Sequence, residues 1–170
     1  SVFAWFTDTE YSWYKDSILS LQAQWLANGY GDGRYGVENN ITRAEVLKLL
    51  LWASHTTISA TRTEKCFPDV DPNLWYHSYI CAAHELGIAN GFADGKFKPN
   101  DPVTTLEAIT FGAKAFGIMD KFWLGEKWYE PLQKFADENA IIPTHSYTLD
   151  TQISRGKSAD LIIRLQEYNR

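Results

Sequence analysis

One arginine stands where this sequence could bind an anion. Residues 42–45 read Thr-Arg-Ala-Glu, a capping box in which the Thr42 hydroxyl accepts the N–H of Glu45 and the Glu45 carboxylate accepts the N–H of Thr42. The pattern predicts a helix start with Arg43 in the first turn, where unpaired N–H groups and the helix dipole favour an anion. Arg43 is therefore a candidate for binding a carboxylate; the alternative is a solvated arginine or one paired with a neighbouring carboxylate.

Two further helix starts have the same form. Thr104 and Glu107 repeat the capping box, but Thr105 stands at the arginine position. Ser154 precedes Arg155, and Gly-Lys follows where Ala-Glu stands in the first pattern. We therefore expect one competent anion site, or two, among three related positions.

The helix starts belong to an internal repeat. Residues 29–35 and 91–97 carry the same glycine-rich phrase, and the offset of 62 also places Trp13-Tyr14 on Trp75-Tyr76. A third copy begins at Trp128-Tyr129 and lacks the glycine phrase. We place the repeats at 1–55, 66–118 and 123–170, and expect them to pack as one unit because no copy could bury its apolar face alone.

Each copy is predicted to be helix, loop, helix, which makes the fold all-α. The second helices should begin near Thr42, Thr104 and Ser154. For the first helices, three-and-four spacing selects a buried face. Its predicted members are Ile18, Leu21, Trp25 and Leu26 in the first copy, and Ile80, Ala83, His84 and Leu86 or Ile88 in the second.

The glycine phrases predict turns. Gly29 and Gly91 are expected to end the first helices in the left-handed conformation, and Asp32-Gly33 and Asp94-Gly95 are turn dipeptides. Alternatively, the same glycines let a sugar approach the backbone. Trp13, Trp75 and Trp128 have a similar pair of interpretations, as core residues or as exposed carbohydrate platforms.

Composition limits the function classes. A net charge of −5 without a basic stripe argues against nucleic acid as a partner. No apolar run reaches 18 residues, so no membrane insertion is expected, and the first residues do not resemble a secretory signal. Cys66 and Cys81 are compatible with a disulfide in an oxidising compartment, or with two buried thiols.

Metal and catalytic motifs are not predicted. Residues 69–73 imitate a calcium loop, but Leu74 replaces the required glycine and Ile80 the bidentate glutamate. His77 and His84 have no partners that would complete a zinc site. Without a nucleophile elbow, phosphate loop or zinc-protease helix, the sequence predicts no enzyme, no metal and no cofactor.

The repeat resembles the S-layer homology (SLH) repeat. In the second copy the resemblance rests on Phe-Pro-Asp-Val at 67–70, Trp75, Gly87-Ile88, Gly91 and the phrase at 94–99; in the first copy it rests on residues 41–45. The resemblance implies three repeats in a pseudo-threefold helical spindle that anchors an extracellular protein noncovalently to a secondary cell-wall polysaccharide. It also implies a terminal N-acetylmannosamine with a pyruvate ketal, whose carboxylate an arginine could hold.

The resemblance gives a set of expected ligand-binding residues. Arg43, Glu45, Gly29, Asp8 and Trp13 are the strongest candidates because the first copy keeps both the arginine and the glycines; the others are Asp69, Trp75, Gly91, Trp128 and Arg155. The alternative functions are a protein–protein interaction module of the cell envelope or S-layer and, ranked last, an enzyme acting on wall carbohydrate.

Overall fold

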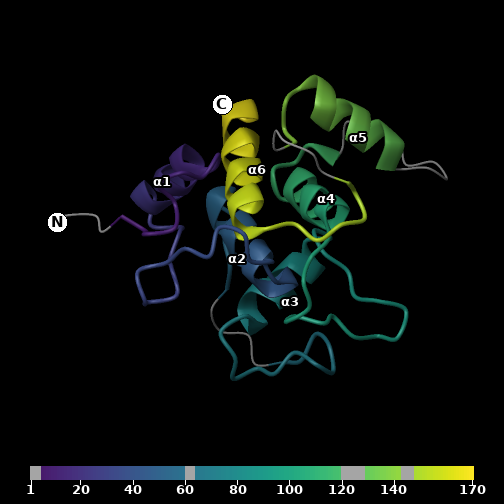
Figure 1. Cartoon of the computed structure of the whole chain (residues 1–170). Coiled ribbons are helices and arrows are strands. Elements are labelled where there is room, and N and C mark those ends of the chain that lie inside the picture. Colours follow the sequence, from purple (N-terminus) through teal and green to yellow (C-terminus); the bar gives the residue numbers. More distant parts are fainter. Residues whose placement is uncertain (1–4, 60–63, 120–128, 143–147) are drawn as a thin grey trace.

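The computed structural model describes residues 5–59, 64–119, 129–142 and 148–170 (Figure 1). Six helices lie within these ranges, and the described residues form no strands beyond three isolated bridges. The predicted all-α fold is confirmed. The helices are α1 (Lys15–Ala23), α2 (Arg43–Ala53), α3 (His77–Glu85), α4 (Thr105–Ala115), α5 (Tyr129–Glu138) and α6 (Arg155–Tyr168).

The helices α2, α4 and α6 begin where the capping residues predict. Thr42 caps α2 and Thr104 caps α4, each in a complete capping box. Ser154 caps α6, and its hydroxyl accepts the N–H of Lys157. A side-chain oxygen at the N-cap satisfies an N–H that has no partner inside the helix, so these short side chains fix the three helix starts.

The first helices end differently from the prediction. The left-handed residue that ends α1 is Trp25 (φ 61°), and its counterpart after α3 is Gly87 (φ 69°), whereas Gly29 and Gly91 do not have positive φ. Trp25 lies beyond the helix and is 72% exposed, so its assignment to the buried face was wrong. Leu86 is exposed for the same reason, because α3 ends at Glu85, and His84, in the last turn of α3, is exposed as well, so its assignment to the buried face was also wrong. The predicted turns at Gly33 and Gly95 are confirmed, with φ of 87° and 77°.

A closed ring of backbone hydrogen bonds joins the three second helices at their starts. Val103 N–H donates to Ile41 O (3.1 Å), Ile153 N–H to Val103 O (3.1 Å), and Ile41 N–H to Ile153 O (3.3 Å). All three side chains are fully buried. Because buried N–H and C=O groups must be paired, each segment needs both others to satisfy its backbone, and the ring gives the fold a pseudo-threefold axis.

The second helices form the centre of the molecule and the first helices lie around them. α2, α4 and α6 contact one another in all three pairs, while α1 packs on α6 and α3 packs on α2 (Figure 1). Each of these two outer helices therefore rests on the second helix of a different repeat. The largest fully buried side chains come from along the whole described part of the chain: Tyr35, Phe97, Ile18, Leu21, Ile41, Leu47, Leu50, Leu51, Ile80, Ile118, Leu132 and Ile153.

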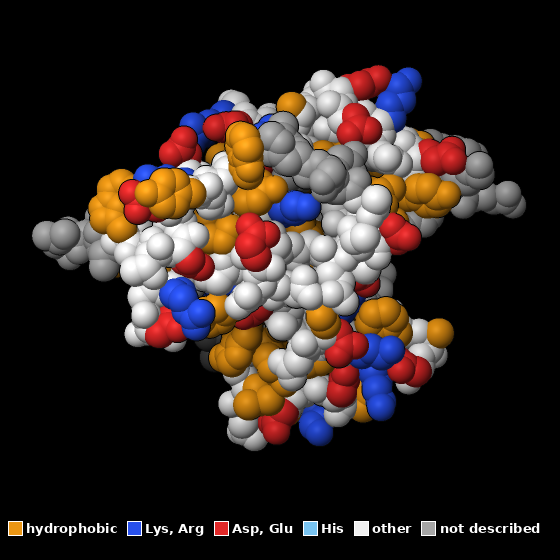
Figure 2. All heavy atoms as spheres, in the orientation of Figure 1, with side chains coloured by type: hydrophobic (Ala, Val, Ile, Leu, Met, Phe, Trp, Pro, Cys, Tyr) orange, Lys and Arg blue, Asp and Glu red, His pale blue; other side chains and the backbone are white. Residues whose placement is uncertain are grey.

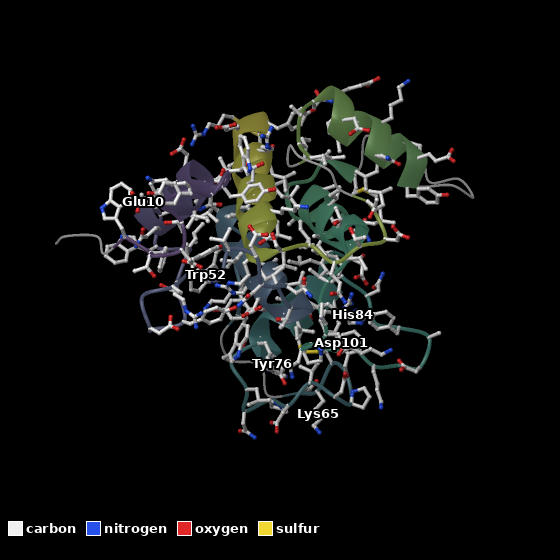
Figure 3. All side chains as sticks on the ribbon, in the orientation of Figure 1. Glu10, Trp52, Lys65, Tyr76, His84 and Asp101 are labelled. Carbon is white, nitrogen blue, oxygen red and sulfur yellow. A yellow bond between two sulfur atoms is a disulfide. The ribbon has the colours of Figure 1, made fainter. Side chains whose placement is uncertain are left out.

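Cys66 and Cys81 form a disulfide, visible as the yellow bond in Figure 3. The bond ties α3 to the segment that leads into the second repeat. None of the helices in the described ranges combines the length and the apolar character needed to cross a membrane.

Candidate functional site

The side chain of Arg155 extends from the first turn of α6 into the first repeat. Its Nε donates to Tyr35 O (2.9 Å), its Nη2 to Asn28 O (3.2 Å), and its Nη1 to the Glu45 carboxylate (3.2 Å). The guanidinium also stacks on the rings of Tyr30 and Tyr35, with its carbon 4.9 Å from each centroid. These contacts hold the loop that follows α1 against the start of α2.

Arg43 makes the equivalent contacts one repeat further on. Its Nε donates to Phe97 O, its Nη2 to Asn90 O, and its Nη1 forms an ion pair with Glu107. The guanidinium carbon lies 4.6 Å from the ring centroids of both Phe92 and Phe97. Burial lowers the pKa of Arg43, and the negative charge of Glu107 opposes that shift.

The expectation that Arg43, Gly29 and Glu45 share one groove is therefore corrected. The side chain of Arg43 extends from the first turn of α2 into the second repeat, away from the loop of its own repeat. The second repeat, whose groove the sequence placed in doubt, receives this arginine. Thr105, which stands at the arginine position of α4, instead faces the segment before α6, where its hydroxyl donates to Thr151 O (3.1 Å).

A hollow of about 190 Å³ lies where Arg155 meets the first repeat, and we call it groove one. Its walls come from the first two repeats and from Arg155 at the start of α6. The residues that matter for its chemistry are Gly29, Tyr30, Glu45, Lys48, Trp75 and Arg155. The structure thus brings together four of the predicted ligand-binding residues, namely Gly29, Glu45, Trp75 and Arg155.

Lys48 supplies a second cation to groove one. Its ammonium lies against the rings of Trp52 (4.6 Å), Trp75 (5.5 Å) and Tyr79 (5.9 Å). No carboxylate of the described residues forms an ion pair with it. Cation–π contacts position an ammonium without neutralising its charge, so Lys48 keeps N–H donors for an anion.

Three of the other predicted site residues, Asp8, Asp69 and Gly91, stabilise loops by hydrogen bonding or close packing. The Asp8 carboxylate accepts the N–H groups of Tyr35 (2.8 Å), Gly36 (2.7 Å) and Val37 (3.2 Å). Burial alone would raise the pKa of Asp8, but these three backbone donors outweigh it and leave the pKa lowered.

In the second repeat, Asp69 and Gly91 also stabilise a loop. Asp69 accepts the N–H groups of Phe97 (2.9 Å) and Lys98 (2.7 Å). Gly91 permits close packing, because a Cβ there would lie 2.6 Å from the Phe67 ring, and Gly29 meets Phe6 in the same way. Packing against Phe6 therefore requires a glycine at position 29 whether or not this residue also faces a sugar.

The tryptophans differ from one another in position. Trp13 is 79% exposed and does not line groove one, whereas Trp75 is 51% exposed and does. Trp128 lies outside the described residues. Sequence reasoning missed Lys48 and Tyr30; Lys48 could have been found because it follows Glu45 by three positions on one helix, which places the two on the same face.

The described residues contain no group of three or more histidine, cysteine, aspartate or glutamate side chains arranged to hold a metal ion. The rejected calcium sequence forms a turn, in which Asp71 accepts the N–H of Asn73 (2.8 Å). His77 instead contacts a backbone oxygen, with its Nε2 2.9 Å from Glu64 O.

The S-layer homology domain model matches residues 6–47 and 67–109, which together make half of the chain. The chain belongs to the S-layer homology domain family. The matched segments are the first two repeats, each from the aromatic residue before its first helix into its second helix. The SLH domain is a non-catalytic module that anchors proteins to the cell wall.

The relatives of this SLH chain include proteins named for the cell surface and the cell wall. A cell surface protein of Thermoanaerobacter kivui is 32% identical over 113 residues, 65% of this chain and 15% of that protein. A middle cell wall protein of Brevibacillus brevis is 33% identical over 128 residues, 74% of this chain and 11% of that protein. Proteins of this kind are extracellular and associated with the cell wall, and so is this SLH module.

Some relatives carry enzyme names. An exoglucanase of Acetivibrio thermocellus is 31% identical over 118 residues, 69% of this chain but 10% of the enzyme. The SLH chain therefore spans between about a tenth and a seventh of the length of these three relatives. A match to so small a part of these proteins identifies an anchoring module and does not extend the enzyme names to this chain.

Proposed function

We propose that this module anchors its parent protein noncovalently to an anionic secondary cell-wall polysaccharide, and that groove one binds a charged terminal sugar of the pyruvylated N-acetylmannosamine type. The observation that carries the proposal is the pair of cations, Lys48 and Arg155, in one hollow beside an exposed tryptophan. A sugar carboxylate needs both positive charge and a surface for its ring, and groove one offers both.

The two cations have different parts in this proposal. Three of the five N–H donors of Arg155 are engaged by Tyr35, Asn28 and Glu45. Arg155 therefore positions the loop and contributes positive charge, partly offset by Glu45. Lys48 is the residue that we propose binds the carboxylate directly, because its ammonium contacts only aromatic rings among the described residues.

The aromatic walls support a sugar ligand. Trp75 is half exposed and Tyr30 is 49% exposed, and both line groove one. Partly exposed aromatic faces bind the apolar face of a pyranose ring while leaving its hydroxyl groups to polar neighbours. Glu45 and the backbone near Gly29 are the polar neighbours available for these hydroxyl groups.

We further propose that residues 123–170 are a third, degenerate SLH repeat and that groove one is the main ligand groove. The hydrogen-bond ring through Ile153 and the capped start of α6 support the first statement. For the second, the position of Lys48 is taken in the second repeat by Thr110, whose hydroxyl bonds to Leu106 O. Arg43 there is enclosed by phenylalanines, and the partly exposed Lys98 that lies over Phe92 is paired with Asp94 (3.6 Å).

Calorimetric titration tests the proposal with purified wall polymer, either intact or with its ketals removed by mild acid. We expect binding only to the intact polymer, and at least tenfold weaker binding by Lys48→Met, since a hydrogen bond to a charged group contributes about 1.5–3 kcal/mol. The matched control is Lys134→Met, which removes an exposed lysine of α5 whose pairing with Glu138 is solvent-screened.

Two outcomes would count against the proposal. Equal binding to both polymers would exclude the ketal as the recognised group. Binding to neither polymer, together with binding to a purified envelope protein, would favour the protein–protein interaction function.

A further inference from the structure

A second hollow lies beside groove one in the first repeat, and we call it the side hollow. It has a volume of about 410 Å³, and Glu10, Tyr11, Gly36, Glu38 and Asn39 are among the residues that line it. Its walls come from the segment before α1 and from the segment that leads into α2. Figure 3 labels Glu10 on this side of the molecule, next to α1.

The Tyr30 side chain separates the two hollows. Tyr30 lines groove one, and its hydroxyl accepts a hydrogen bond from the Asn39 amide, which lines the side hollow (3.2 Å). Gly36, also of the side hollow, packs directly against the Tyr30 ring, where a Cβ would overlap the ring. The two hollows therefore meet at one half-exposed aromatic side chain, close enough for one extended ligand to occupy both.

The chemistry of the side hollow differs from that of groove one. One of its lining residues, Tyr11, is 95% exposed, and hydrophobic side chains gather with acidic ones on the α1 side of the surface (Figure 2). Glu10 and Glu38 are exposed carboxylates that accept hydrogen bonds, while the nearby Arg34 is paired with Asp32 (2.8 Å). An aromatic face with acceptor oxygens suits an uncharged sugar and repels a second anionic group.

We propose that the side hollow is a second subsite, which binds uncharged sugar units of the same polysaccharide whose charged terminal sugar occupies groove one. The inference rests on the proposed function of groove one. Tyr11 is the stacking platform, and Glu10 and Glu38 accept hydrogen bonds from sugar hydroxyls. The opposite charge of the two hollows then fixes the direction of the chain, with its anionic end at Lys48 and its neutral units across Tyr30.

Titrations with two ligands test this subsite. One is a methyl glycoside of pyruvylated N-acetylmannosamine, and the other is a wall oligosaccharide of several units that ends in the same sugar. We expect Tyr11→Ala to weaken binding of the oligosaccharide roughly two- to tenfold, the range of one lost stacking contact, and to leave binding of the single sugar unchanged. Tyr11→Phe keeps the ring and should bind both ligands as the original chain does.

Leu86→Ala is the matched control, because Leu86 is an exposed apolar residue of the second repeat that lines neither hollow. If the original chain binds the single sugar and the oligosaccharide equally well, or if Tyr11→Ala weakens both to the same extent, the subsite is excluded while groove one stands. If the original chain binds neither ligand, the proposed function fails and the subsite fails with it.

Discussion

Arg155 and Glu45 are 110 residues apart in the sequence, yet their side chains form an ion pair of 3.2 Å in groove one. The pair joins the start of the last helix to the second helix of the first repeat. The groove that carries the proposed function is therefore complete only when α2 and α6 have folded together.

Removal of Arg43 is expected to affect stability rather than binding. Arg43→Met leaves Glu107 and two backbone carbonyls without their donor, and we expect a loss of about 3 kcal/mol in the free energy of unfolding. Urea unfolding measures the loss, and titration of the folded variant should give the original affinity for the polymer. A large loss of affinity in a variant that remains folded would show that Arg43 takes part in ligand binding.

Tyr35→Phe is expected to stabilise the protein. The Tyr35 hydroxyl is buried and has no hydrogen-bond partner among the described residues, and burial raises the pKa of Tyr35 to about 12. The equivalent residue of the second repeat is Phe97, which is also fully buried. An unpaired buried hydroxyl costs about 1–3 kcal/mol, so its removal should raise the midpoint of thermal unfolding. Phe97→Tyr is the reverse experiment and should lower it; a lower midpoint for Tyr35→Phe would mean that the hydroxyl is hydrogen-bonded.

Asp8 is expected to make stability depend on pH in the acid range. Its pKa is lowered in the folded protein, so the ionised carboxylate stabilises the fold above the unfolded value near 4, and this stabilisation is lost as the pH falls through the folded pKa. Asp8→Asn should therefore be less stable than the original chain at pH 7, and the difference should shrink below about pH 4. Asp150→Asn, at an exposed aspartate, serves as the control and should show no such difference. Urea unfolding at several pH values measures it, and a constant difference would contradict the prediction.

Reduction of the disulfide is expected to lower stability without changing the fold. The bond closes a loop of 15 residues, for which chain entropy predicts about 3 kcal/mol. Thermal unfolding with and without a reductant measures the change, and Cys66→Ser with Cys81→Ser should match the reduced protein. An unchanged midpoint would show that the unfolded chain gains no freedom when the bond is broken.

The sequence alone determined the elements of this fold because their signals are local. Thr42, Thr104 and Ser154 each bond to an N–H three residues later, and a contact of that range can be recognised in the sequence. The turns at Gly33 and Gly95 were predictable for the same reason, since the dipeptides Asp-Gly require no distant partner. The end of α1 was not predictable, because Trp25 occupies a left-handed position that usually selects glycine.

Only the tertiary structure decided which residues form the candidate site. The sequence grouped Arg43 with Gly29 because both belong to one repeat, but a long arginine side chain at a helix start reaches whatever the threefold packing places next to it. Groove one therefore takes its arginine from the start of α6 and its tryptophan from the second repeat. Repeat periodicity identifies equivalent residues within copies, whereas the contacts between copies depend on how the hydrogen-bond ring through Ile41, Val103 and Ile153 closes.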